Sequence, residues 1–153
     1  MMNDAAMASR RSGITGAIGR LYAGLEAFPL SVIEVLMRIG GGAVFFKSGL
    51  TKIANMEITV DLFREEYKVP LLAPEIAAPL ATAAELTAPV LLVLGLLTRP
   101  AAAALLGMTA VIQLFVYPAN WSEHLLWASI LIYLVTRGPG TLSVDHLARK
   151  SLG

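Results

Sequence analysis

The stretch PAAAALLGMTAVIQLFVY, residues 100–117, contains no charged residue and decides the fold class of this chain. A helix needs about 20 predominantly apolar residues to cross a hydrocarbon core of about 30 Å, so this stretch predicts a membrane span. Three further windows of similar character, at about 30–50, 75–97 and 121–135, predict three more spans. We therefore expect an all-α, polytopic membrane protein built as a bundle of four transmembrane helices.

Composition supports a membrane protein and excludes several functional classes. Hydrophobic residues make up 56% of the 153 residues and charged residues only 15%, against roughly 25% charged in soluble domains. The net charge of +1 and the lack of a basic stripe argue against nucleic-acid binding. With no cysteine and only two histidines, we expect no disulfide, no thiolate catalysis and no metal site within the chain. No nucleophile–base pattern predicts a catalytic residue.

The chain divides into three parts. Residues 1–28 are a polar N-terminal segment, 29–137 the four-span membrane domain and 138–153 a polar tail. Between the first and second spans, apolar side chains recur at near-helical spacing among acidic ones, at Ile58, Leu62, Phe63 and Tyr67. This pattern predicts a short amphipathic helix lying on the membrane surface.

The distribution of basic residues predicts the orientation in the membrane. Four spans place both termini on one side, and that side carries seven basic residues: Arg10, Arg11, Arg20, Arg99, Arg137, Arg149 and Lys150. The other side carries Lys52, Arg64 and Lys68. Since Lys and Arg are commoner on the cytoplasmic side, we expect a multi-pass protein of the inner (plasma) membrane with both termini in the cytoplasm.

Ionisable residues within the spans require partners. By helix rise, Arg38 lies about 12 Å, Glu85 about 18 Å and Gln113 about 20 Å from the cytoplasmic end. We therefore expect these three groups to meet in one hydrogen-bonded cluster. An unpaired arginine at that depth costs at least about 2.5–3.5 kcal/mol. Glu85 is the predicted partner of Arg38, and Glu34, one helical turn earlier, is the competing one.

Two interpretations of these charges stay open. They form either an ion pair that locks helices together or a functional site, which is a polar floor for a ligand such as a quinone head group, a proton relay or a docking point for a partner's helix. Glu34, Arg38 and Lys52 share one face of the first helix. His124, beside Glu123 at the start of the fourth span, either caps that helix at the interface, binds a ligand, or ligates a metal that another protein holds in part. The candidate ligand- or partner-binding residues are Arg38, Glu85, Gln113, Glu34, Lys52 and His124.

Two segments resemble the signatures of the DoxX family. In the first predicted span, residues 36–52, the matching positions are Arg38, Gly40, Phe45, Gly49 and Lys52. In the second, residues 85–99, they are Glu85, Gly95, Leu96, Thr98 and Arg99. The resemblance covers about residues 30–137 and implies a four-helix membrane bundle.

The resemblance also suggests a role. DoxX family members are associated with quinone-linked sulfur oxidation, with membrane oxidoreductase complexes and with operons for modified metal-binding peptides. The leading hypothesis is a membrane subunit that supports a quinone-linked oxidoreductase, with no covalently bound cofactor and no independent enzymatic activity. The alternatives are a non-catalytic membrane partner for an exported peptide, metal or cargo protein, and a small transporter. The expected partners are the lipid bilayer and a membrane or periplasmic protein, and a homodimer stays open.

Overall fold

The computed structural model describes residues 16–70 and 72–152, and within them all regular structure is helical. The all-α prediction is therefore confirmed for the described part of the chain. The main unit comprises Ser31–Gly153, and its first helix begins one residue earlier. In chain order, its elements are α2 (Leu30–Ala54), α3 (Met56–Leu62), the π-helix η1 (Phe63–Tyr67), α4 (Pro74–Leu94), α5 (Thr98–Val111), the π-helix η2 (Ile112–Val116), the 3₁₀ turn η3 (Pro118–Asn120), α6 (Trp121–Arg137) and α7 (Val144–Leu152).

The N-terminal unit, Met1–Leu30, is a separate part of the chain. Its described residues form a helix, Gly16–Glu26. Ile18, Leu21 and Leu25 lie at helical spacing and are exposed. The polar segment predicted for residues 1–28 thus contains an amphipathic helix, whereas its first 15 residues lie outside the described part.

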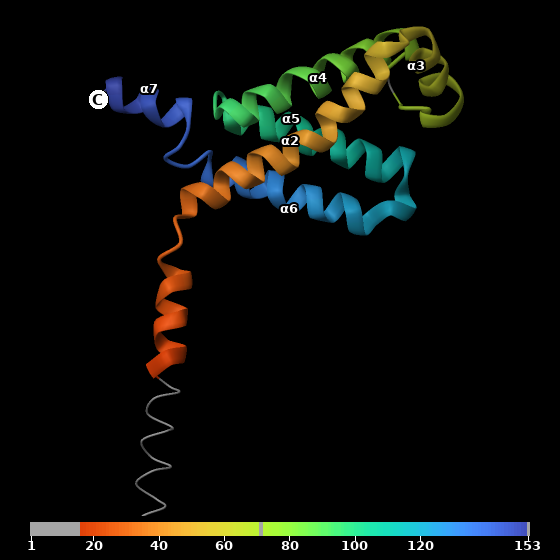
Figure 1. Ribbon diagram of the computed structural model, residues 1–153. Helices are drawn as coiled ribbons and strands as arrows, with labels where there is room; N and C mark the ends of the chain where they lie inside the picture. The colour runs from red at the N-terminus through yellow and green to blue at the C-terminus, as the bar shows by residue number, and fades with distance from the viewer. Residues whose placement is uncertain (1–15, 71, 153) are drawn as a thin grey trace, which may run out of the picture. The chain divides into compact units, whose positions relative to one another are not determined.

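Helices α4, α5 and α6 lie side by side and form the core of the main unit (Figure 1). Leu92, Leu105 and Leu131 come from the three helices and are fully buried. The connection from α4 to α5 is tight because Gly95 and Leu97 both take left-handed backbone conformations, with φ of 66° and 48°. Such a residue after the last helical turn is a common helix stop. The short turn reverses the chain, so that α5 runs back alongside α4.

Helix α2 crosses over these three helices (Figure 1), and glycines allow the close approach. A Cβ atom at Gly41 would lie 3.1 Å from Ile130 of α6, and one at Gly49 would lie 2.9 Å from Leu86 of α4. Small residues at a helix crossing let the two backbones come near each other. The helix is also longer than the predicted span at 30–50, because it continues to Ala54.

The helices have the apolar character of membrane spans, but fewer than the four predicted are both long enough and apolar enough to cross a membrane. Helix α4 and the stretch Thr98–Val116 are each long and apolar enough to cross a membrane, and α2 is counted as a third span only together with Gly16–Glu26. Helix α6 has 17 residues, about 25 Å of helix. Two or three candidate spans are therefore present, and a count of four stays a prediction.

The connection between α2 and α4 contains the predicted short helix. Asn55 caps α3, since its side chain accepts a hydrogen bond from the Ile58 amide at 3.0 Å. Phe63 of η1 is buried against Ala77 and Ala78 of α4. One side of this segment is thus packed against the bundle.

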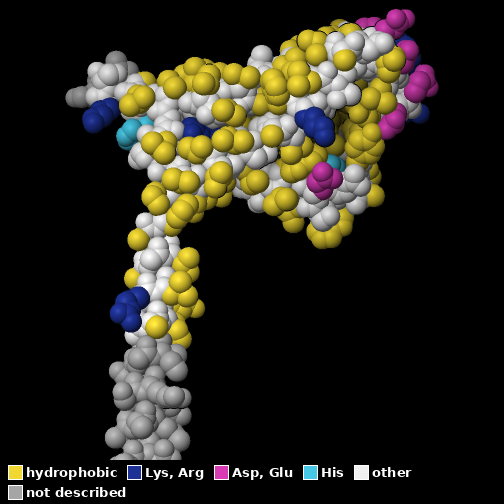
Figure 2. Space-filling model, in the orientation of Figure 1, with side chains coloured by type: hydrophobic (Ala, Val, Ile, Leu, Met, Phe, Trp, Pro, Cys, Tyr) yellow, Lys and Arg dark blue, Asp and Glu magenta, His cyan; other side chains and the backbone are white. Residues whose placement is uncertain are grey.

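Acidic side chains gather over the end of the bundle that carries α3, whereas hydrophobic side chains cover much of the visible helical surface (Figure 2).

The predicted polar tail, residues 138–153, contains a helix, α7, that is hydrogen-bonded to the start of α5. The Asp145 carboxylate in α7 accepts hydrogen bonds from the amides of Leu97 (2.9 Å) and Thr98 (3.0 Å), and so caps the start of α5. Although burial raises the pKa of Asp145, the two amide donors outweigh it and hold the pKa below its ordinary value. The cap joins residues 48 positions apart, so local sequence could not reveal it.

Candidate functional site

A cavity of about 480 Å³ lies near the end of the bundle that carries α3 and η1, which we call the α3 end. Helices α2, α4, α5 and α6 and the π-helix η1 all contribute side chains to it. Most of the wall is apolar and comes from Val44, Phe45, Phe63, Leu80, Met108, Val111, Ile112 and Trp127. Its volume falls within the range of about 300–1,000 Å³ that holds small ligands.

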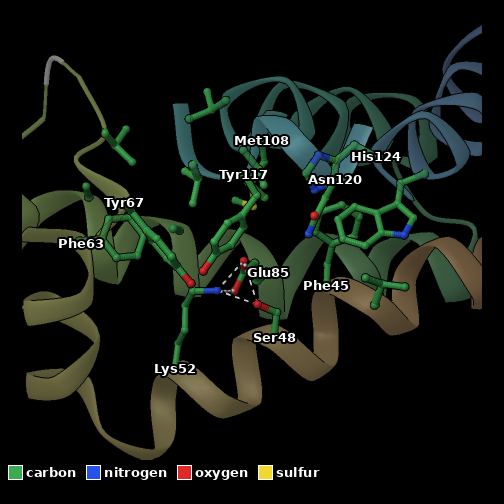
Figure 3. Close-up of a pocket in the computed structure, with 18 of the residues that line it drawn as sticks. Phe45, Ser48, Lys52, Phe63, Tyr67, Glu85, Met108, Tyr117, Asn120 and His124 are labelled. Carbon is green, nitrogen blue, oxygen red and sulfur yellow. Dashed lines mark hydrogen bonds and ion pairs between the residues drawn. The ribbon is translucent and has the colours of Figure 1, made fainter. Parts of the chain in front are cut away.

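A buried ion pair forms the polar part of the cavity wall (Figure 3). The Lys52 ammonium donates to both carboxylate oxygens of Glu85 at 2.8 Å, and to the Ser48 hydroxyl at 2.6 Å. Ser48 in turn donates to Glu85 at 3.3 Å. Lys52 and Glu85 are only 8% and 3% exposed. Ser48 and Lys52 lie four residues apart on α2, so one helix face presents both groups to Glu85.

Two tyrosines stand beside this ion pair. Figure 3 shows Tyr67 and Tyr117 with their hydroxyl groups directed toward Lys52 and Glu85. Their rings meet edge to face, with centroids 5.8 Å apart. The Tyr117 hydroxyl donates to the Glu66 carboxylate. This hydrogen bond raises the pKa of Tyr117 well above its usual value, and burial raises the pKa of Tyr67.

On another part of the wall, His124 is held in a defined orientation. Its Nδ1 atom lies 2.7 Å from Gln113 Oε1, and the Gln113 amide nitrogen donates to the Pro118 carbonyl at 2.9 Å. Because Gln113 Oε1 is an acceptor, Nδ1 carries the proton and Nε2 is the acceptor in the neutral ring. The ring also packs on Trp127, with centroids 5.1 Å apart. Gln113 therefore lies behind His124 and orients it.

A second polar cluster lies at the opposite end of the bundle, which carries α7. Arg38 is 2% exposed and donates from Nη2 to the Leu142 carbonyl at 2.7 Å. Its Nε and Nη1 atoms have no hydrogen-bond partner among the described residues. Glu34, 7% exposed, accepts a hydrogen bond from the Tyr133 hydroxyl at 3.2 Å. This cluster ties α2 to α6 and to the segment before α7.

The predicted Arg38–Glu85–Gln113 cluster is wrong. The guanidinium of Arg38 lies against Gly95, since a Cβ atom there would be 2.0 Å from Nη1. Gly95 is ten residues beyond Glu85, which is about 15 Å along a helix. The depth estimate failed because α2 crosses the bundle and continues past its predicted end. Lys52 lies beyond the predicted span of residues 30–50, and this extension of α2 brings it to Glu85.

The six predicted site residues thus separate into three groups. Lys52 and Glu85 form the cavity ion pair, Gln113 and His124 form the second pair near the cavity, and Glu34 and Arg38 lie at the α7 end. Sequence reasoning missed Ser48, Tyr67 and Tyr117. The spacing of Ser48 from Lys52 is a usable signal, whereas nothing local relates the two tyrosines. Among residues 16–70 and 72–152, no three His, Asp or Glu side chains gather as a metal site would require.

Comparison with known proteins agrees with the family resemblance. The family model described as DoxX matches residues 33–118, which is more than half of the chain. The match begins within α2, three residues after its start, and continues through η2, so it includes Ser48, Lys52 and Glu85. No curated protein and no solved structure matches the chain. The match over most of the helical bundle, together with the apolar helices, identifies this chain as a membrane protein of the DoxX family.

Proposed function

We propose that this protein is a non-catalytic membrane subunit that binds a lipid-soluble, quinone-like molecule and thereby supports a quinone-linked oxidoreductase. The observation that carries the proposal is the Lys52–Glu85 ion pair in the wall of a mostly apolar cavity. Small-molecule sites commonly combine apolar walls with a few precisely placed polar groups. The family association with quinone-linked complexes points in the same direction.

The side chains around the cavity fit a quinone head group. A quinone supplies two carbonyl oxygens that accept hydrogen bonds, and its reduced form supplies two hydroxyl groups that donate them. All three donors of the Lys52 ammonium are used by Glu85 and Ser48, so Lys52 can donate to a ligand only by exchanging one of these bonds, such as the one to Ser48. Glu85 can accept from a donor on the ligand through its remaining lone pairs. His124 offers a second polar contact from α6. The rings of Phe45 and Trp127, 5.6 Å apart and edge to face, supply the aromatic wall.

The chain's own role in this proposal is to bind and orient the ligand. Lys52 and Glu85 are already paired, so no isolated charge has to be buried when the apolar ligand enters. Ser48 bonds to both partners and limits their movement. The proposed location is the inner membrane with both termini cytoplasmic, so that the α3 end faces outward.

Ligand binding can be measured with the protein's own fluorescence. Trp127 lines the cavity, and in a Trp121→Phe background it is the single tryptophan. Titration with a short-chain quinone in detergent should quench Trp127 saturably. The paired change Lys52→Gln with Glu85→Gln should abolish the saturable part, because the polar contacts are lost.

The control neutralises one basic and one acidic side chain elsewhere on the surface, Lys47→Gln with Glu57→Gln. Both side chains are exposed and lie outside the cavity lining and outside η1. The control should leave quenching unchanged. Quenching that is linear in quinone and equal in all variants would reject the site. Co-purification of a peptide, a metal or a cargo protein in place of quinone would instead favour the alternative role as a non-catalytic membrane partner.

A further inference from the structure

The cavity is bounded at the α3 end by η1, which contributes Phe63 and Tyr67 to its wall. One side of this segment is firmly attached to α4. Phe63 is buried there with Ala77 and Ala78, and Arg64 forms an ion pair with Glu75 at 2.6 Å. The attachment combines apolar burial with charge pairing. We therefore regard the α4 side as the fixed side of η1.

The opposite side of η1 is held differently. Tyr117 directly follows η2. Among the described residues, it makes both the hydrogen bond and the aromatic contact that join this part of the chain to η1. Its hydroxyl donates to Glu66, and its ring packs on Tyr67. Tyr117 itself is 39% exposed. Besides the approach of η1 to η2, this side thus depends on the hydrogen bond and the ring contact of one partly exposed side chain, Tyr117.

Local backbone geometry is unusual at both partners of this contact. Glu66 and Tyr67 lie in a π-helix, and Tyr117 directly follows the other π-helix. Isolated π-helical turns are rare and frequently occur at functional sites. Lys68, which ends η1, takes a left-handed conformation with φ of 44°, which is uncommon for a residue other than glycine. The backbone next to the contact therefore departs from regular α-helix on both sides.

We propose that Tyr117 is a latch that closes the cavity at the α3 end and controls access to the ligand site. Release of its contacts with Glu66 and Tyr67 would let η1 move away while its α4 side stays packed. The inference rests on the proposed function in one respect, since the cavity that the latch closes is the proposed ligand site. The latch can nevertheless be tested without any ligand.

The chain has no cysteine, so single introduced thiols report access. Ala81 lines the cavity, and Ala102 is fully buried in the core of α5. The experiment measures the rate at which a water-soluble maleimide modifies Ala81→Cys in detergent, with and without Tyr117→Phe. Loss of a hydrogen bond to a carboxylate should raise this rate by roughly tenfold, which corresponds to about 1.4 kcal/mol. Glu66→Gln should raise it in the same direction.

Two controls separate a latch from general loosening. Tyr133→Phe also removes a hydroxyl bonded to a carboxylate, but at the α7 end, so it should not change the Ala81→Cys rate. The Ala102→Cys thiol should stay unreactive in every variant. Unchanged modification of Ala81→Cys in both Tyr117→Phe and Glu66→Gln would overturn the proposal, as would an equal rise at Ala102→Cys. If the protein binds no quinone but the maleimide modification rates of Ala81→Cys change as predicted, only the proposed function is rejected and the latch stands.

Discussion

Neutralising one member of the Lys52–Glu85 pair should destabilise the protein much more than neutralising both. Glu85→Gln leaves the Lys52 ammonium, 8% exposed, with only Ser48 and a neutral amide as partners. Removing one partner of a buried ion pair costs about 3–5 kcal/mol, whereas replacing both is often nearly neutral. At about 2–4 °C per kcal/mol for a chain of this size, each single change should lower Tm by about 6–20 °C.

Thermal unfolding in detergent of the wild type, Lys52→Gln, Glu85→Gln and the double variant measures this coupling. The double variant should recover most of the loss seen in either single variant. The control is a second cycle that combines Arg38→Gln with Glu85→Gln. Arg38 bonds to Leu142 at the other end of the bundle, so these losses should add within about 0.3–0.5 kcal/mol. Additive losses for Lys52 and Glu85, or coupling between Arg38 and Glu85, would refute the assigned pairing.

Three further changes test the packing around the site and the cap of α5, each by thermal unfolding. Gly49→Ala should cost about 1–3 kcal/mol through overpacking against α4, whereas Gly40→Ala, with nothing within 4 Å of its added Cβ, should be neutral or stabilising; equal effects would contradict the close helix approach. Gln113→Leu should cost about 1–3 kcal/mol because it leaves the His124 Nδ1 donor unpaired. Asp145→Ala should cost about 0.5–2 kcal/mol at pH 7 through loss of the helix cap. Because the pKa of Asp145 is lowered on folding, its contribution is present above the unfolded pKa of about 3.9 and is lost as the pH falls through the lowered value. The Asp145→Ala difference should therefore shrink at acid pH, and a constant difference would argue against the carboxylate cap.

Helical class and membrane character could be predicted from the sequence because both depend on local composition. Residues 100–117 have no charge, and the helix Thr98–Val116 lies there. The short helix after the first span was also predictable, since Ile58, Leu62 and Phe63 recur at helical spacing. These properties require no knowledge of how one helix lies against another.

The pairing of buried charges could not be predicted in the same way. The pairing depends on which turn of α2 lies opposite Glu85 where the two helices cross. If that crossing point is misplaced by a few helical turns, a different basic residue of α2 is assigned to Glu85. Arg38 and Lys52 lie on the same face of α2, so both are candidates for Glu85 by sequence alone. Only the close approach at Gly49, whose added Cβ would lie 3.0 Å from that of Glu85, selects Lys52.

Long-range contacts explain the other omissions. Asp145 caps a helix whose first residue lies 47 positions earlier, and Tyr117 bonds to Glu66 across 51 positions. Hydrogen bonds of this kind form because α4 and α5 return the chain to the same ends of the bundle. Residue type and spacing carry no trace of them.

The central claim, that the cavity beside Lys52 and Glu85 holds a quinone head group, is tested most directly by photochemical cross-linking. A short-chain quinone with a photoreactive group would be irradiated with the purified protein, and mass spectrometry would locate the adducts. We expect adducts within residues 44–52 and 120–127, suppressed by excess unlabelled quinone and lost when Lys52→Gln and Glu85→Gln are combined. Adducts confined to exposed positions away from the cavity, such as Val90 and Val93, and insensitive to competing quinone would contradict the account.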